Sequence, residues 1–469
     1  MGHPLCYWGL TYSYGPFLNK PGVTPNELAY AHEAAVVANQ ALNSTAWDLS
    51  EAAENLIRSS LVRFPNCDKY TLDDAQNYAA FLKGVAGDDI DMLTMYAEAE
   101  MDVLSLRGGG YYTLNGEMNP GEPRDEASRA MEALEKVIEG ADDRGPHPQA
   151  LHLYIHVTEP LAPGDGAAKG ENSASILSHL NITDSGHLLH MPGHLFMRVG
   201  RYDDVVQSNV LAHKADDLYE NNGMIPYGPA HNTYFLVAAA ALDGQSSVAI
   251  EYSKIIRDVY LHNPDMKDSP GVEEGWNTLL TMYLRFGLWK EVLNDVDWRV
   301  PAVFGLGTDN NYGDYLGRYC RGHAHFQLGD TESAQKELEA MEGMTLDDKF
   351  EARAKVALLS LKARLVGGED GLELLKEATE EQNGWEYNSP PHFIQPMNQC
   401  LSAYLLNIGR EDDAAGAASM DLAEFPNNGW GLYAMYLATG EEEWKYKANE
   451  AWERSDNVLE SPCLLWGES

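Results

Sequence analysis

The segment MRVGRYDD at residues 197–204 contains the pattern that decides the fold, and the pattern returns along the chain. In each copy an apolar stretch ends at a glycine and a second stretch of helical composition follows. Glycine suits the left-handed position just after a helix, because it has no side chain to clash. Each copy therefore predicts two helices joined by a tight turn. The other copies are ALDGQSSV (241–248), LRFGLWKE (284–291), FQLGDTES (326–333) and LNIGREDD (406–413).

These glycines recur at a nearly fixed interval. Gly200, Gly244, Gly287 and Gly329 are separated by 44, 43 and 42 residues, and Gly409 follows after 80, close to two intervals. A fixed period in this range indicates a solenoid of stacked helical hairpins. The period exceeds the ~34 residues of a minimal tetratricopeptide (TPR) unit. We therefore expect an all-α, tetratricopeptide-like helical-hairpin solenoid with longer helices or loops.

Helical periodicity also occurs outside these turns. In residues 125–140 and again in residues 272–284, the apolar side chains fall on one helix face. The pattern predicts N-terminal helical hairpins (1–106), a Gly-rich, aromatic loop (107–122), histidine-rich central hairpins (123–245) and C-terminal TPR-like hairpins (246–469).

The chain is strongly acidic. Its 469 residues include 72 Asp and Glu against 33 Lys and Arg, a formal net charge of −39. Because like charges repel, we expect a soluble protein that binds neither nucleic acid nor anionic membranes. The longest apolar run, 235–242, is too short to cross a bilayer, and the first ten residues lack the features of a signal peptide.

The number and spacing of the cysteines indicate the redox state of the protein's cellular compartment. An odd, dispersed set with no CxxC pair argues against a disulfide framework and against a thiolate zinc site. We therefore expect a reducing compartment and a cytoplasmic location. The five are Cys6, Cys67, Cys320, Cys400 and Cys463.

Histidine is crowded in the central hairpins, where nine of the 15 lie between residues 147 and 231. The first element is HPQALHLYIHVTEP (147–160), in which His152, His156 and Glu159 have the spacing i, i+4 and i+7. This spacing places two imidazoles and a carboxylate on one helix face, an arrangement that binds metal ions. The motif is not HExxH, so it predicts no protease chemistry.

Two further elements are HLLHMPGHLFMRVG (187–200) and YGPAHNTYFL (227–236). His194 and His231 each follow a proline at the start of a hairpin, so stacking of neighbouring hairpins should bring them together. His190 precedes its proline in a turn and can curl back toward His194.

The three elements together offer five imidazoles and one carboxylate, enough for one crowded site or two metal ions. Such ligands suit Fe, Cu, Mn or Zn without discriminating among them. The alternative is a metal-free histidine network, hydrogen-bonded between helices. The predicted ligands are His152, His156, Glu159, His190, His194 and His231.

Glu159 is also a candidate general base near the metal. Arg198 is a candidate for bidentate binding of an anionic group of the substrate. A salt bridge to an acidic neighbour is the alternative for Arg198. The sequence does not decide whether His187 and His213 bind the metal directly or form hydrogen bonds that support its ligands. Glu98 and Glu100 could each be a further carboxylate ligand or a solvated side chain, and the sequence does not decide between these two roles.

These motifs resemble a family of large TPR-repeat-containing proteins, common in bacteria, with HxxxHxxE and HxxHMPxH motifs. The resemblance covers most of the chain and implies a helical solenoid, with no established activity to carry over. Family members usually have a further helix, often with a histidine, before the YWG segment; this sequence lacks it. The resemblance rests on residues 6–19, 147–160, 187–209, 230–232 and 430–440.

We therefore expect a metal-dependent enzyme that acts on a small molecule in the concave face of the solenoid. Open histidine-rich sites suit iron and copper, which favours an oxidase or oxygenase over a hydrolase. The alternative is a protein-binding scaffold that holds a peptide in the concave groove, with a structural metal or none. Three ligands with an open position would favour the enzyme, and a closed set of four the scaffold. The sequence does not define the oligomeric state.

Overall fold

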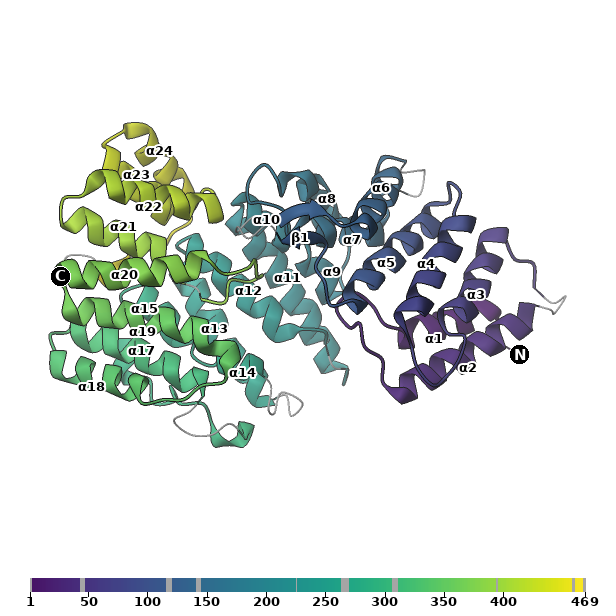
Figure 1. The fold of residues 1–469 in the computed structure, drawn as a ribbon, viewed down its shortest axis with the longest axis horizontal. Coiled ribbons are helices and arrows are strands. Elements are labelled where there is room, and N and C mark those ends of the chain that lie inside the picture. Colours follow the sequence, from purple (N-terminus) through teal and green to yellow (C-terminus); the bar gives the residue numbers. More distant parts are fainter. Residues whose placement is uncertain are drawn as a thin grey trace. The chain divides into compact units, whose positions relative to one another are not determined.

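The computed structural model describes residues 2–42, 47–114, 120–140, 145–224, 226–262, 270–305, 311–393, 395–457 and 460–466. These residues form the predicted all-α fold of tetratricopeptide-like helical hairpins, with one pair of short strands (Figure 1). The chain divides into two compact units. Unit 1 is residues 1–161 with 172–180, and unit 2 is residues 162–171 with 181–469.

Unit 1 is built from antiparallel helices whose starts are set by capping side chains. Thr71 and Asp74 form a reciprocal capping box at α4, and His147 caps α7 just ahead of Pro148. The apolar faces of α4 to α7 share one buried core. The helices are α1 (Pro4–Tyr14), α2 (Pro25–Leu42), α3 (Glu51–Arg63), α4 (Leu72–Val85), α5 (Ile90–Leu106), α6 (Asp125–Glu139) and α7 (Pro148–Thr158), while α8 (Ala168–His179) begins in unit 2 and ends in unit 1.

The predicted Gly-rich loop at 107–122 contains two short strands. β1 (Tyr112–Leu114) pairs antiparallel with β2 (Pro120–Pro123), and residues 115–119 lie outside the described part. The Tyr112 hydroxyl donates a 2.6 Å hydrogen bond to the carbonyl of Val157. The strand pair is thereby fixed against the last turn of α7.

Unit 2 contains all five predicted hairpin turns. Their glycines have φ between 71° and 83°, the left-handed conformation that only glycine adopts readily. The near-double interval before Gly409 holds one more hairpin, α19 and α20. The helices are α9 (Gly186–His190), α10 (Pro192–Val199), α11 (Tyr202–Asn221), α12 (Pro229–Leu242), α13 (Ser246–His262), α14 (Pro270–Gly275), α15 (Thr278–Arg285), α16 (Trp289–Asn294), η2 (Ala302–Phe304), α17 (Tyr312–Gln327), α18 (Thr331–Glu342), η3 (Asp348–Phe350), α19 (Glu351–Val366), α20 (Gly368–Asn383), α21 (Met397–Asn407), α22 (Glu411–Glu424), α23 (Gly429–Thr439), α24 (Glu442–Ala451) and η4 (Leu464–Trp466).

The periodic segment 272–284 is not one helix, as its pattern predicts, but parts of two. α14 ends at Gly275 and α15 begins at Thr278. Between them Asn277 is fully buried, and its side-chain amide donates to the carbonyls of Trp298 (2.7 Å) and Gly313 (2.6 Å). These bonds to remote backbone hold the break.

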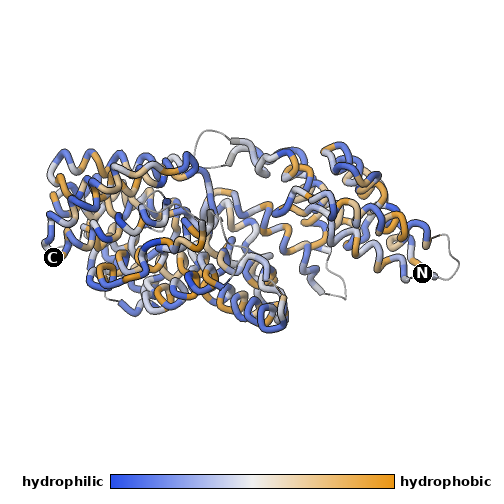
Figure 2. Tube along the Cα trace, turned by 90° about the horizontal axis from the view of Figure 1, so that it is seen from below, coloured by the Kyte–Doolittle hydropathy of each residue, from blue (hydrophilic) through white to orange (hydrophobic). Residues whose placement is uncertain are grey.

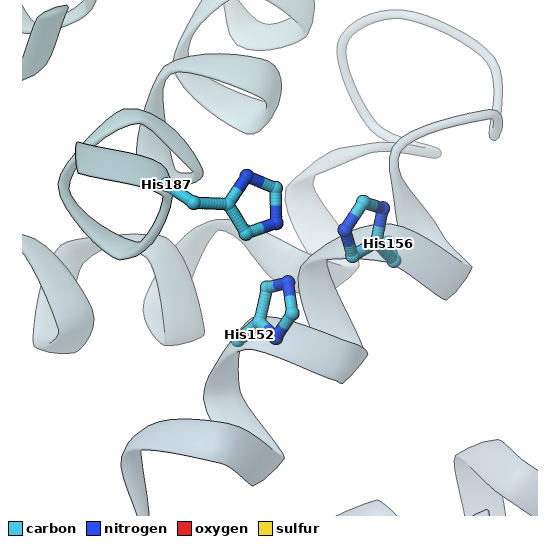
Figure 3. Close-up of side chains that lie close together, drawn as sticks. All are labelled: His152, His156 and His187. Carbon is cyan, nitrogen blue, oxygen red and sulfur yellow. The ribbon is translucent and has the colours of Figure 1, made fainter. Parts of the chain in front are cut away.

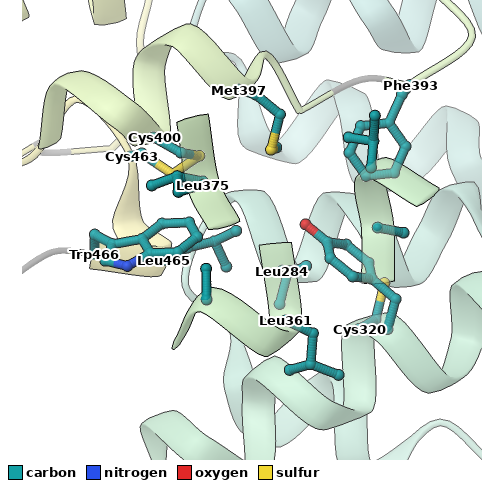
Figure 4. Close-up of a cluster of buried hydrophobic side chains, with 14 of the residues drawn as sticks. Leu284, Cys320, Leu361, Leu375, Phe393, Met397, Cys400, Cys463, Leu465 and Trp466 are labelled. Carbon is teal, nitrogen blue, oxygen red and sulfur yellow. A yellow bond between two sulfur atoms is a disulfide. The ribbon is translucent and has the colours of Figure 1, made fainter. Parts of the chain in front are cut away.

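A large apolar core of unit 2 joins α15, α17, α19 and α21 to the segment that contains η4 (Figure 4). In it Cys400 and Cys463, 63 residues apart in sequence, form a disulfide with a Cα–Cα distance of 4.8 Å. The sequence argued against such bonds, because spacing along a chain does not show which cysteines the fold brings together. A cytoplasmic location stays a prediction.

α12 is buried over most of its length, and every residue from Phe235 to Leu242 is buried. Its Ala241 carbonyl accepts hydrogen bonds from Arg285 Nε (3.1 Å) and Trp430 Nε1 (3.0 Å). Elsewhere polar and apolar positions alternate along the helices (Figure 2), as amphipathic helices require. Within the described ranges, none of the helices combines the length and apolar character needed to cross a membrane.

Candidate metal centre

Three histidines of unit 2, here called the triad, meet where α9, α10 and α12 come together. α9 ends at His190, and α10 follows after one residue with Pro192 in its first turn. His190 and His194 therefore stand one helical turn apart on the same side. His231 lies in the first turn of α12, two residues after Pro229. The predicted convergence of the two hairpin starts is present.

The triad imidazoles are close enough to bind a single ion. His190 Nε2 lies 2.8 Å from His194 Nε2, and one ligand atom from each residue lies within 4.8 Å of the other two. Ligand nitrogens of a tetrahedral zinc site, with bonds of about 2.0–2.1 Å, are about 3.3 Å apart. The spacing therefore needs only small ring movements to surround an ion. Phe235 packs against all three rings.

Hydrogen bonds behind the triad set the orientation of two rings. Asn209 Nδ2 donates to the carbonyl of Val205 (2.9 Å), so its Oδ1, 2.6 Å from His190 Nδ1, accepts the imidazole N–H. His190 therefore keeps its lone pair on Nε2, the atom that faces His194. On the other side, the Ser389 hydroxyl lies 3.2 Å from His194 Nδ1. The same contacts complete a metal-free hydrogen-bonded chain, the alternative that the sequence left open.

The protein environment lowers the pKa of two triad imidazoles, His190 and His231. His190 is fully buried and His194 is 6% exposed, while His231 retains exposed surface. Burial, followed by the neighbouring His194 imidazole, lowers the pKa of His190 well below its usual value. The same two causes, in the same order, lower the pKa of His231 to about 3. A neutral imidazole has a free lone pair, the form that binds a metal ion.

A pocket of about 300 Å³ adjoins the triad. His231 and Ser389 both line it, so one triad ring and the hydroxyl that contacts His194 face the same space. The triad therefore borders the pocket at His231. Further lining side chains come from α12, α13, α14 and residues 388–392: Tyr234, Tyr260, Glu274, Asn388 and His392.

The other predicted ligands, here called the α7 group, lie in unit 1. His152 and His156 are buried on one side of α7 with ring centroids 4.8 Å apart (Figure 3). Glu159 directly follows the helix, and its Oε1 lies 4.0 Å from His156 Nδ1. The predicted helix face is therefore formed. Ligation by these side chains, a base role for Glu159 and a single six-ligand site all stay predictions.

Arg198 forms the salt bridge that was the alternative to substrate binding. Its Nη1 lies 3.1 Å from Glu424 Oε1, and its guanidinium stacks over the Tyr387 ring at 4.2 Å. The side chain is 4% exposed. These contacts give it a structural role, and a role in orienting the substrate stays a prediction.

The two further histidines have different surroundings. His187 on α9 contacts the rings of His190 (6.4 Å) and Tyr227 (5.0 Å), and burial lowers its pKa to about 4. His213 on α11 packs against Tyr252, 5.6 Å between ring centroids. Whether His187 acts as a ligand or as a support stays open, and the contacts of His213 point away from a ligand role.

Glu98 and Glu100 of unit 1 both contact other side chains. The Tyr12 hydroxyl lies 2.7 Å from both carboxylate oxygens of Glu98, and Arg129 binds Glu100 through two bonds of 2.7 and 2.8 Å. Both carboxylates are buried rather than solvated.

Sequence reasoning missed the side chains that complete the pocket. Ser389 and His392 lie in the sequence NSPPH (388–392), which reads only as a loop, and Glu274 sits among other acidic residues. Ser389 is 195 residues from the histidine that it contacts. No local pattern links such distant segments.

No family model matches the chain, and no curated protein matches it. Among solved structures, a monomeric mutant of IFIT1 with Gppp-AAAA is 10% identical, covers 92% of this chain and 87% of its own, and has a TM-score of 0.32. A chain of the APC/C hetero-tetramer Cut9-Hcn1 is 14% identical, with a TM-score of 0.30; the alignment covers 92% of this protein and 90% of that chain. Similarity at this level carries no functional argument, so the absence of nucleic-acid binding stays a prediction.

Proposed function

We propose that His190, His194 and His231 bind one divalent transition-metal ion and that the protein is a metal-dependent enzyme for a small molecule. One observation carries the proposal: His231 belongs both to the triad and to the wall of the 300 Å³ pocket. A molecule in that pocket would lie beside the ion.

The chain's own residues would perform three tasks at this site. The triad supplies nitrogen ligands, Asn209 fixes the His190 ring through a 2.6 Å hydrogen bond, and the pocket walls position the molecule. With three protein ligands, the ion keeps coordination positions for other molecules. It would supply redox or Lewis-acid chemistry there, and histidine ligands with open positions favour iron or copper and hence an oxidase or oxygenase.

The test is the metal content of purified protein, measured by mass spectrometry after reconstitution with iron, copper, manganese or zinc. We expect near-stoichiometric metal in the wild type and its loss in the double variant His190→Ala/His194→Ala. The matched control is His179→Ala/His262→Ala, which removes two exposed histidines whose ring nitrogens contact backbone carbonyls in their own helices.

Circular dichroism shows whether each variant keeps its helices. Metal in the control but not in the triad variant supports the proposal, and the ion found selects between oxygen-dependent and hydrolytic assays. Folded wild type that takes up none of the four ions would contradict it. The hydrogen-bonded chain from Ser389 through His194 and His190 to Asn209 would then be a polar core within a helical scaffold.

A further inference from the structure

The pocket beside the triad has a one-sided charge. Among the described side chains that line it, Glu274 is the one carboxylate, and none is a lysine or an arginine. Burial, followed by the nearby Arg353, lowers the pKa of His392 to about 4, so this imidazole is neutral. The carboxylate of Glu274, which is paired with Arg353, is therefore the charged group among the described lining side chains.

The nearest arginine is already engaged. Arg353 Nη1 donates to Glu274 Oε1 (2.7 Å), and its Nη2 contacts His392 Nε2 (3.0 Å). Because an arginine only donates, His392 Nε2 accepts and its Nδ1 carries the hydrogen. Arg353 thus holds one oxygen of Glu274 and orients His392 while lying outside the set of lining residues.

Two tyrosines add aromatic surface to the pocket. Burial first, and the Glu274 charge second, raise the pKa of both Tyr234 and Tyr260, while the Arg353 charge acts to lower that of Tyr234. The Tyr260 hydroxyl packs so close to Gly275 that a Cβ there would lie 2.4 Å from it. Glycine at this position is what allows the tyrosine to stand in the pocket wall.

We propose that this pocket selects small molecules with a protonated amine, with Glu274 as the counter-charge and the tyrosine rings as walls. A partly buried carboxylate attracts an ammonium group more strongly than it would in water, and aromatic rings attract cations. An anion would meet Glu274 and find no free cation among the described lining residues. The inference rests on the proposed function, because it names the substrate class of that site.

The test compares three probes of similar size and different charge: 2-phenylethylamine, 2-phenylethanol and phenylacetate. Binding is measured by calorimetry on chelator-treated wild type, so the result does not depend on a metal. We expect the amine to bind about tenfold more tightly than the alcohol, and phenylacetate not measurably, from charge attraction in a partly buried site. Equal binding of all three, tighter binding of phenylacetate, or no binding of any probe would overturn the proposal.

Two variants locate the binding. Glu274→Gln removes the negative charge and frees Arg353, so we expect the amine preference to disappear and phenylacetate to gain affinity. Gly275→Ala displaces Tyr260 from its place in the pocket wall and should weaken the binding of all three probes. The matched control Glu251→Gln, an exposed glutamate on α13, should keep the wild-type order.

Circular dichroism confirms that each variant is folded, and the wild-type ranking tests the charge preference without any variant. An unchanged amine preference in folded Glu274→Gln would overturn the proposal. Failure here leaves the metal measurement unaffected, since the triad variants are tested without a probe molecule.

Discussion

The triad of unit 2 and the α7 group of unit 1 contain similar side chains but are assembled in different ways. The α7 group comes from one helix and its end, so the helical repeat alone sets its spacing. The triad takes its three rings from three helices and holds two of them from behind with Asn209 and Ser389. The difference teaches that a ligand pattern visible in one helix and a site built by packing are separate kinds of evidence.

The strongest way to break this comparison is to remove each pair of imidazoles in turn. His190→Ala/His194→Ala should lower metal affinity by more than about 100-fold, because loss of an outer hydrogen-bond partner alone costs about 10–100-fold. His152→Ala/His156→Ala should retain the ion at the triad. Competition with a chromophoric chelator gives the affinity, and mass spectrometry gives the number of ions per chain.

The stoichiometry of the α7 variant also sharpens the comparison. A fall from two ions to one would assign a second, independent ion to the α7 group. Loss of all metal from this variant, in folded protein, would contradict the separation and favour the single crowded site that the sequence left open.

A smaller effect is expected from the side chain behind the triad. Asn209→Leu removes the acceptor for His190 Nδ1–H, so we expect metal affinity to fall by about 10–100-fold. Asn209→Asp keeps an acceptor at the same place and should restore most of the affinity. The control is Asn222→Leu, an exposed residue just after the same helix. Equal affinities for the leucine and aspartate variants would show that Asn209 does not position the ligand.

The smallest effect on the metal is expected from Arg198, because its contacts are structural. Arg198→Met leaves Glu424 without its cation; breaking a fully buried pair costs about 3–5 kcal/mol, while an exposed pair is worth about 0–1. The Glu424 side chain is 28% exposed, so we expect a stability loss of about 1–3 kcal/mol with unchanged metal and amine binding.

Urea unfolding measures that loss, and the double variant Arg198→Met/Glu424→Gln should recover part of it. A loss of amine binding at unchanged stability would instead return Arg198 to the role of a substrate contact.

Local chemistry explains what the sequence could predict. The hairpin turns follow from single glycines, because a positive φ is a property of one residue. The closeness of His190 and His194 follows from their spacing across one turn. The meeting of His194 with His231 follows from equivalent positions in adjacent hairpins.

Contacts between distant segments explain which features could not be predicted from the sequence. The break at Asn277 is held by carbonyls 21 and 36 residues further along the chain. The Cys400–Cys463 bond and the approach of Ser389 to His194 likewise depend on how remote hairpins pack. Periodicity reports which face of a helix is apolar, and it does not report which segment will cover that face.

The end of α12 has a consequence for how the protein is made. Its Ala241 carbonyl is satisfied in part by the indole of Trp430, 189 residues further along the chain. Its other partner, Arg285, is only 44 residues further along, so the two hydrogen bonds to this carbonyl become possible at widely separated points of synthesis. The triad histidines are thus synthesised long before the Ser389 hydroxyl that contacts His194. For the proposed metal site, capture of the ion is therefore expected to follow synthesis of both segments.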